Sequence, residues 1–212
     1  MTSYYACLPA VSALLAAVVG GWLATLVIRR ESGLSDVPMR WIVAAGVPLA
    51  LWAAAVMPNP FLLAVTLLLA WVLLVLGAVD LLAFRLPDVL TLPLIAAGLL
   101  LSLRLPDTDP LAHVAGAAIG FAALYGIAVA YRRARGREGL GLGDAKLTAA
   151  AGAWLGWQPL PSLLLIACAA GFISIGIGML WRGKAALQEE IAFGVPLCLA
   201  FWIVWLYGPI AV

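Results

Sequence analysis

The sequence predicts an all-α polytopic membrane protein with about eight transmembrane helices, and a count of six or seven stays open. Of its 212 residues, 66% are hydrophobic and 10% are charged, and the mean hydropathy is +1.12. Soluble domains carry roughly 25% charged residues. Lipid admits only helices or closed barrels, because an unpaired backbone group there costs several kcal/mol. The apolar runs are long and lack the alternation of strands, which indicates helices.

Eight apolar stretches are candidate spans, since about 20 residues cross a hydrocarbon core of roughly 30 Å. The first covers about 4–28 and ends before two arginines. No basic residue precedes this long stretch, so we do not expect a cleaved signal peptide. The second, fourth and sixth stretches have fewer than 20 residues, which leaves the count open. The seven later stretches are about 41–57, 60–79, 89–103, 112–131, 145–158, 163–181 and 191–208.

Lys and Arg residues predict the orientation of these spans, because positive loops are retained in the cytoplasm. With eight spans, the side opposite to the cytoplasm holds only Arg104. The asymmetry supports the eight-span map and places both termini outside the cytoplasm. The other eleven lie on the cytoplasmic side: Arg29, Arg30, Arg40, Arg85, Arg132, Arg133, Arg135, Arg137, Lys146, Arg182 and Lys184.

The remaining composition argues against several kinds of site. Cys7, Cys168 and Cys198 lie far apart in apolar stretches, and no CxxC pair is present to bind zinc or form a redox dithiol. We therefore predict no metal site. No basic tail or Lys/Arg patch with aromatic residues indicates nucleic-acid binding.

Small residues predict where helices touch. Gly116 and Gly120 form a GxxxG pair in the fifth stretch, while Gly171, Ser174 and Gly178 have similar spacing in the seventh. Such residues allow the backbones of neighbouring membrane helices to approach closely. Because no linker or repeat interrupts the chain, we predict a single transmembrane domain over residues 1–212.

Loop solvation explains most of the ten carboxylates, but not Asp80 and Asp144. Asp80 follows the apolar run 71–79 and precedes Leu-Leu-Ala-Phe, while Asp144 closes a Gly-Leu-Gly-Asp string and opens the sixth stretch. An ionisable residue at membrane depth is costly and is a functional-site candidate. The predicted topology places both at the cytoplasmic ends of their helices. If these helices pack together, the two carboxyls share a proton and provide one acid and one base for peptide hydrolysis.

Two features near Asp144 fit this interpretation. Gly141 and Gly143 lack a Cβ, which permits unusual dihedral angles and lets an extended substrate approach the backbone. The positive end of the sixth helix would favour the ionised form of Asp144.

Simpler and different interpretations stay open at this point. Asp144 could cap the sixth helix, and Asp80 could pair with Arg85 near the interface. The alternative function is a proton-coupled membrane transporter that uses the two aspartates as protonation sites. That function predicts acidic residues near the bilayer midplane on inverted repeats, and the sequence has neither. A noncatalytic assembly subunit is a third interpretation, against which the presence of both aspartates counts.

Four sequence blocks carry a resemblance to a known family. Residues 80–94 read DLLAFRLPDVLTLPL, residues 139–147 read GLGLGDAKL, residues 152–157 read GAWLGW and residues 193–196 read FGVP. These blocks resemble those of the type IV prepilin peptidases, GxGD aspartic proteases that remove basic leader peptides from prepilins and pseudopilins. The FGVP block departs from the family's Phe-Gly-Pro by an inserted valine. The resemblance implies a peptidase core over about 60–200.

The resemblance also implies roles for individual residues. Asp80 and Asp144 would be the catalytic pair. Pro87 and Asp88 would form a turn that Asp88 orients as the N-cap of the fourth helix, with substrate contact as the alternative for Asp88. Lys146 would bias the charge of Asp144 or extend to the membrane surface.

Prepilins and pseudopilins are the implied partners, together with the lipid bilayer. Such a substrate presents a basic leader in the cytoplasm ahead of a hydrophobic helix, so the site should face the cytoplasm from the bacterial inner membrane. Glu138, Glu189 and Glu190 are candidate contacts for the leader's positive charge. Ordinary solvation, or pairing with Arg137 and Lys184, is the alternative for these three glutamates.

Proteolysis by an aspartate pair needs no cofactor. Many bacterial members of the family carry two CxxC pairs between their first two spans and also methylate the new N-terminus. Here the corresponding loop, residues 29–40, contains no cysteine, so we expect no zinc domain. Methyltransferase activity, and with it S-adenosylmethionine as a cofactor, stays an open alternative. The oligomeric state is open as well.

Overall fold

The computed structural model describes residues 39–106, 108–136, 141–183 and 192–210, and these ranges contain helices and no strands. The predicted all-α class is therefore confirmed for the described chain. Three helices, α3, α5 and α7, are long and apolar enough to cross a membrane, which agrees with a multi-pass membrane protein. The helices are α2 (Met39–Val56), α3 (Pro60–Ala83), α4 (Asp88–Ser102), α5 (Pro110–Arg135), α6 (Leu142–Leu155), α7 (Leu160–Arg182) and α8 (Gly194–Tyr207).

Each of the last seven predicted stretches corresponds to one of these helices, while the first predicted span, 4–28, lies outside the described residues. Two boundaries differ in ways that matter. Helix α3 continues to Ala83, so Asp80 lies inside its last turn rather than after it. Helix α6 begins at Leu142, three residues before the predicted start, so the GxGD string lies mostly inside the helix.

The chain divides into two compact units, residues 1–83 and 84–212. In the first unit, α2 packs against α3. Gly46 lies directly against the indole ring of Trp71, where any Cβ would overlap the ring. Asn59 lies just before α3 and caps it, because its side-chain oxygen accepts hydrogen bonds from the backbone N–H groups of Phe61 and Leu62 at 2.9 and 3.3 Å.

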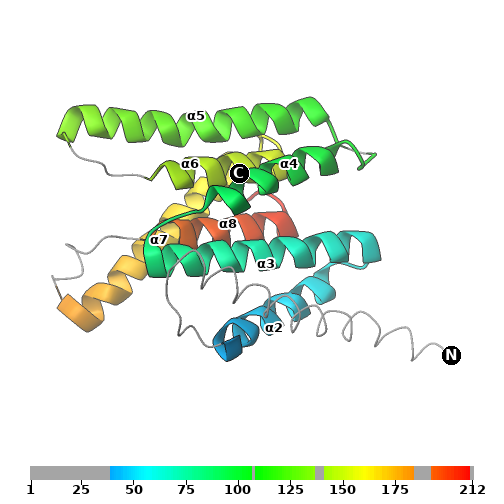
Figure 1. Cartoon of the computed structure of the whole chain (residues 1–212), viewed down its shortest axis with the longest axis horizontal. Helices are drawn as coiled ribbons and strands as arrows, with labels where there is room; N and C mark the ends of the chain where they lie inside the picture. The colour runs from blue at the N-terminus through cyan, green and yellow to red at the C-terminus, as the bar shows by residue number, and fades with distance from the viewer. Residues whose placement is uncertain (1–38, 107, 137–140, 184–191, 211–212) are drawn as a thin grey trace. The chain divides into compact units, whose positions relative to one another are not determined.

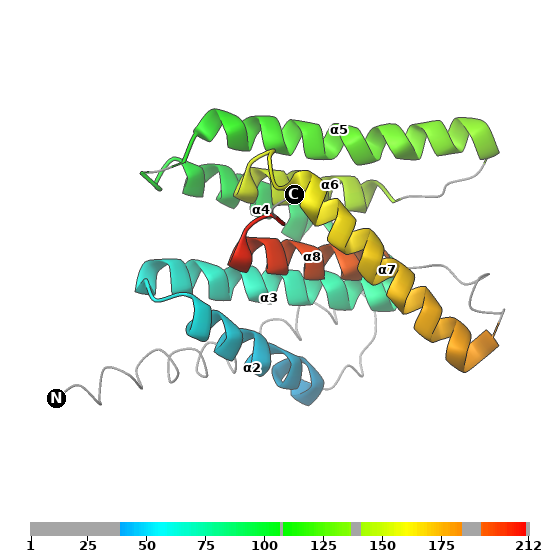
Figure 2. The same cartoon turned by 180° about the vertical axis from the view of Figure 1, so that it is seen from behind.

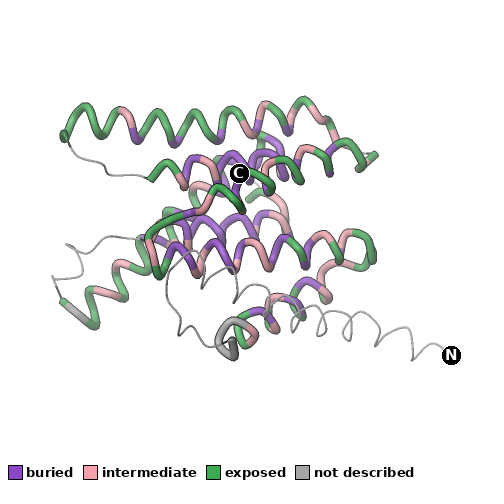
Figure 3. The backbone as a smooth tube through the Cα atoms, viewed as in Figure 1, coloured by how far each residue is buried: buried purple, intermediate pink, exposed green. Residues whose placement is uncertain are grey.

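Helix α6 lies at the centre of the second unit, where it contacts α4, α5, α7 and α8. Figures 1 and 2 show α5 running alongside α6. Figure 3 shows α6 as mostly buried and α5 as mostly exposed. At 1.5 Å per residue, the 14 residues of α6 extend about 21 Å, less than the bilayer core. Helix α6 is therefore a short inner helix surrounded by other helices.

Glycines allow the close approach of α5 and α6. A Cβ on Gly116 would lie 2.5 Å from the carbonyl oxygen of Gly152, and one on Gly120 would lie 2.6 Å from that of Thr148. The predicted contact face on α5 is therefore confirmed. On α7, Gly171 is in ordinary contact with Phe193, but Ser174 is exposed and bonds to the Gly171 carbonyl oxygen of its own helix. For Ser174 the predicted contact with another helix is wrong in the described chain.

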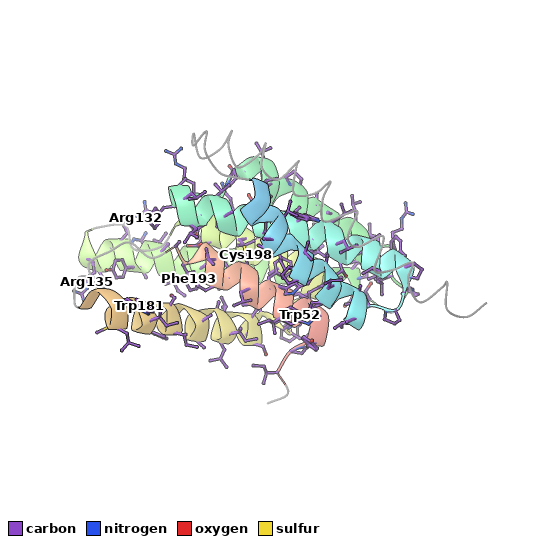
Figure 4. All side chains as sticks on the ribbon, turned by 90° about the horizontal axis from the view of Figure 1, so that it is seen from below. Trp52, Arg132, Arg135, Trp181, Phe193 and Cys198 are labelled. Carbon is purple, nitrogen blue, oxygen red and sulfur yellow. The ribbon has the colours of Figure 1, made fainter. Side chains whose placement is uncertain are left out.

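Several positively charged side chains lie at helix ends of the second unit. Figure 4 shows Arg132 and Arg135 at the end of α5, and Trp181 near the end of α7, at the same end of this unit. Lys146, in the second turn of α6, is bonded to Asp88 at the start of α4. Arg104 follows α4 at its other end.

Candidate functional site

Asp80 continues a buried stripe along α3. Thr66, Leu69, Leu73, Leu76 and Asp80 recur every three or four residues, which places them on one side of the helix, and all five are buried. Asp80 is only 6% exposed, whereas its neighbour Leu81 is 63% exposed. The carboxyl therefore points to the side of α3 that elsewhere carries packed apolar side chains.

Asp144 lies in the first turn of α6 and is 8% exposed. The N-cap of this helix is Gly141, and Asp144 is the third helical residue, so the interpretation of Asp144 as a helix cap is wrong. Its backbone N–H donates to the Gly141 carbonyl oxygen at 3.2 Å. Asp144 therefore lies at the positive end of the helix dipole, where an ionised carboxylate is favoured.

The two glycines of the GxGD string do not have unusual dihedral angles. Gly141 has φ −71° and ψ 142°, an extended conformation open to any residue, and Gly143 lies within α6 without a positive φ. The expectation of special dihedral angles is therefore wrong. Gly143 is instead a point of close packing, because a Cβ there would lie only 2.8 Å from the Cβ of Leu86.

Asp88 and Lys146 form an ion pair. The Lys146 Nζ donates to Asp88 Oδ1 at 2.6 Å, with side-chain exposures of 28% and 55%. Asp88 is the first residue of α4, and the N-cap is Pro87, without a side-chain capping bond. The predicted N-cap role of Asp88 is therefore wrong, and Lys146 has a partner that neither of its predicted roles named. Sequence analysis missed the pair because 58 residues separate its members.

The other end of α6 is held by two buried side chains that the sequence analysis did not single out. His113 Nδ1 lies 2.9 Å from the Ala153 carbonyl oxygen, and Trp154 Nε1 donates to the Leu94 carbonyl oxygen at 2.8 Å. Ala153 is among the last four residues of α6, whose carbonyl oxygens have no hydrogen-bond partner within the helix. His113 therefore provides a hydrogen bond to one of these carbonyl oxygens. The sequence feature that could have drawn attention to His113 is that it is a lone histidine in an apolar run.

The three candidate leader contacts, Glu138, Glu189 and Glu190, lie outside the described residues. In the described ranges, no group of three or more His, Cys, Asp or Glu residues could hold a metal ion.

Comparison with known proteins decides the family. The model of the type IV leader peptidase family matches residues 67–176, more than half of the chain. The chain belongs to the type IV leader peptidase family. Both Asp80 and Asp144 lie within the matched residues, as do Leu86, Asp88 and Lys146. This membership confirms the resemblance and does not support the transporter alternative.

The relatives of this chain include three proteins that are named prepilin leader peptidase/N-methyltransferase. That of Aeromonas salmonicida (strain A449) is 46% identical over 95 residues, which are 45% of this chain and 32% of the relative. That of Burkholderia pseudomallei (strain K96243) is 46% identical over 83 residues, 39% of this chain and 26% of the relative. That of Dickeya chrysanthemi is 47% identical over 83 residues, 38% of this chain and 28% of the relative.

The matched stretch spans about a third or less of the length of these relatives. No solved structure matches the chain.

The relatives' names raise the question of S-adenosylmethionine. This cofactor carries a carboxylate, an ammonium and a sulfonium group, so its site needs charged or polar groups that complement them. Near Asp144 in the described second unit, the charged side chains Asp88 and Lys146 are bonded to each other. The chemistry of the aspartate pair does not require this cofactor.

Proposed function

We propose that this chain is an aspartic endopeptidase that cleaves the basic leader peptides of prepilins or pseudopilins, with Asp80 and Asp144 as its catalytic pair. The observation that carries the proposal is the burial of both aspartates, whose residues are 6% and 8% exposed, at helix ends within the family-matched residues. Burying an ionisable group in an apolar chain is costly. A catalytic task explains why the chain does so twice.

In the proposed reaction, one ionised and one protonated carboxyl act together. The ionised carboxylate takes a proton from water, and the water oxygen bonds to the carbonyl carbon of the scissile peptide. The protonated carboxyl donates its proton to the leaving nitrogen as the C–N bond breaks. The position of Asp144 at the positive end of α6 favours it as the base and Asp80 as the acid.

The membrane position follows from the charge-based topology. That topology puts the end of α3 and the start of α6 on the cytoplasmic side of the bacterial inner membrane. A prepilin leader lies on that side, ahead of the hydrophobic helix that anchors the substrate. Glu138, Glu189 and Glu190 are the proposed contacts for its basic residues.

The test uses the full chain in vesicles with a prepilin whose leader ends in Gly before Phe or Met. We expect Asp80→Asn and Asp144→Asn each to abolish cleavage, measured by mass spectrometry of the product. Asp109→Asn is the matched control, because the Asp109 side chain caps the start of α5 by accepting from the Leu111 backbone N–H at 3.0 Å, which asparagine can also do, so the change should leave cleavage intact. Full activity in either catalytic variant would contradict the proposed pair.

Methylation is tested in the same vesicles. Labelled S-adenosylmethionine is added during cleavage, and the new N-terminus is analysed for the label. A labelled product would add a methyltransferase activity to this chain. An unlabelled product would leave it a peptidase only.

A further inference from the structure

The segment Leu86–Asp88 contacts the first two turns of α6 on both sides of Asp144 in the chain. Leu86 lies against Gly143, the residue before Asp144, and the Asp88 carboxylate accepts a hydrogen bond from Lys146, two residues after it. We propose that this segment is a positioning bracket that fixes the Asp144 carboxyl for catalysis. The inference rests on the proposed function.

The apolar arm of the bracket is Leu86. It is 9% exposed, and a Cβ on Gly143 would lie 2.8 Å from its Cβ, 3.3 Å from its Cδ1 and 3.4 Å from its Cγ. Real Cβ atoms do not approach a neighbour as closely as 2.8 Å, so glycine is the residue that lets α6 reach Leu86. A larger residue at position 143 would push the turn that carries Asp144 away from the bracket.

The ionic arm is the Asp88–Lys146 pair. Residues two apart on a helix do not face each other, so we expect Lys146 to act on Asp144 through the backbone of α6. At 28% and 55% exposure the pair is screened by solvent and contributes modestly to folding. Its effect is geometric, because a charge-assisted hydrogen bond of 2.6 Å sets the start of α6 against the start of α4.

The bracket itself is stiff. The Pro87 ring restricts φ, here −69°, and the Pro87 carbonyl oxygen accepts the backbone N–H groups of Leu90 and Thr91, each at 3.1 Å. The bracket thus holds the start of α4 against the turn of α6 that carries the proposed base.

The ionic arm is tested with Asp88→Asn, Lys146→Gln and the double variant in the prepilin assay. We expect each single change to lower kcat about tenfold with KM within about twofold, since small misplacements of a catalytic group are costly. The double variant should lose no more than either single variant, because both remove one interaction. Lys146→Arg should restore most of kcat. Arg135→Gln, which removes a positive charge from the exposed end of α5, is the matched control.

The apolar arm is tested with Gly143→Ala, for which Gly126→Ala is the control because nothing lies within 4 Å of a Cβ at Gly126. We expect Gly143→Ala to lower kcat about tenfold, by the same loss of alignment. Leu86→Gly removes the side-chain atoms that would clash with Ala at position 143. Introduced together with Gly143→Ala, it should restore part of the lost kcat.

Three results would overturn the bracket: unchanged kcat in the single variants, a change confined to KM, or additive losses in the double variant. The bracket would also be overturned if kcat falls only in proportion to the fraction of folded protein, measured by thermal unfolding. If the wild type cleaves no prepilin, the proposed function fails. The bracket is then judged by hydrogen exchange of residues 142–147, which should accelerate in Asp88→Asn but not in Arg135→Gln; equal rates would overturn it.

Discussion

Four buried side chains of the described chain that carry polar groups form two pairs with different roles. His113 and Trp154 bond to helix carbonyl oxygens, so they hold the far end of α6 in place. Asp80 and Asp144 are anomalous because aspartate interrupts apolar runs at the ends of two helices. Sequence alone identified the aspartates for this reason. It did not identify the partners of His113 and Lys146, which lie 40 and 58 residues away along the chain.

Trp154→Phe tests the hydrogen bond that anchors α6 to α4. The change keeps most of the ring packing against Phe201 and Trp205 but removes the donor to the Leu94 carbonyl oxygen. We expect a loss of about 1–2 kcal/mol in the free energy of unfolding, the usual cost of removing one partner of a buried hydrogen bond. Reversible unfolding in mixed detergent measures it.

Trp157→Phe is the control, because Trp157 is 48% exposed and its replacement should change stability by less than about 0.5 kcal/mol. Equal losses in the two variants would show that the Trp154 bond contributes nothing of its own.

At the scale of the element, α6 combines short length, small residues and near-complete burial. The existence of this helix was predictable, because hydropathy dominates in lipid. Its boundaries were not: the sixth stretch is predicted to begin at about 145, yet α6 begins at Leu142, and Gly143 lies within it and packs against Leu86. Asp88 was misread in the same way, as a cap rather than a partner of Lys146. Contacts between helices depend on pairings that periodicity does not encode.

Gly152→Ala tests the contact between α5 and α6. A Cβ on Gly152 would overlap backbone atoms of Gly116, which cannot move without separating the two helices. We expect a loss of about 1–3 kcal/mol in the free energy of unfolding, the usual cost of overpacking. Gly126→Ala on α5 is the control, because a Cβ there meets no atom within 4 Å and alanine favours the helix by up to about 1 kcal/mol. Gly152→Ala at wild-type stability would contradict this close contact.

At the scale of the whole molecule, hydropathy indicates a multi-pass membrane protein, and the family match assigns it to the type IV leader peptidase family. The predicted single domain over 1–212 stays a prediction, as does the orientation of the spans. Orientation decides function here, because a leader peptidase of the proposed kind must present its aspartates to the compartment that holds the leader. The charge asymmetry gives a direct way to test it.

Single cysteines at Pro106 and Ala134 test the orientation, in a background where Cys7, Cys168 and Cys198 are replaced by alanine. Pro106 follows α4 near Arg104, and Ala134 lies among the arginines that end α5; both positions are exposed. Because positive loops stay in the cytoplasm, we expect a membrane-impermeant maleimide to label Pro106→Cys in intact spheroplasts and Ala134→Cys only after lysis. The reverse pattern would place the start of α6 and Asp144 outside the cytoplasm, away from any prepilin leader. Labelling of both before lysis would mean that α5 does not cross the membrane.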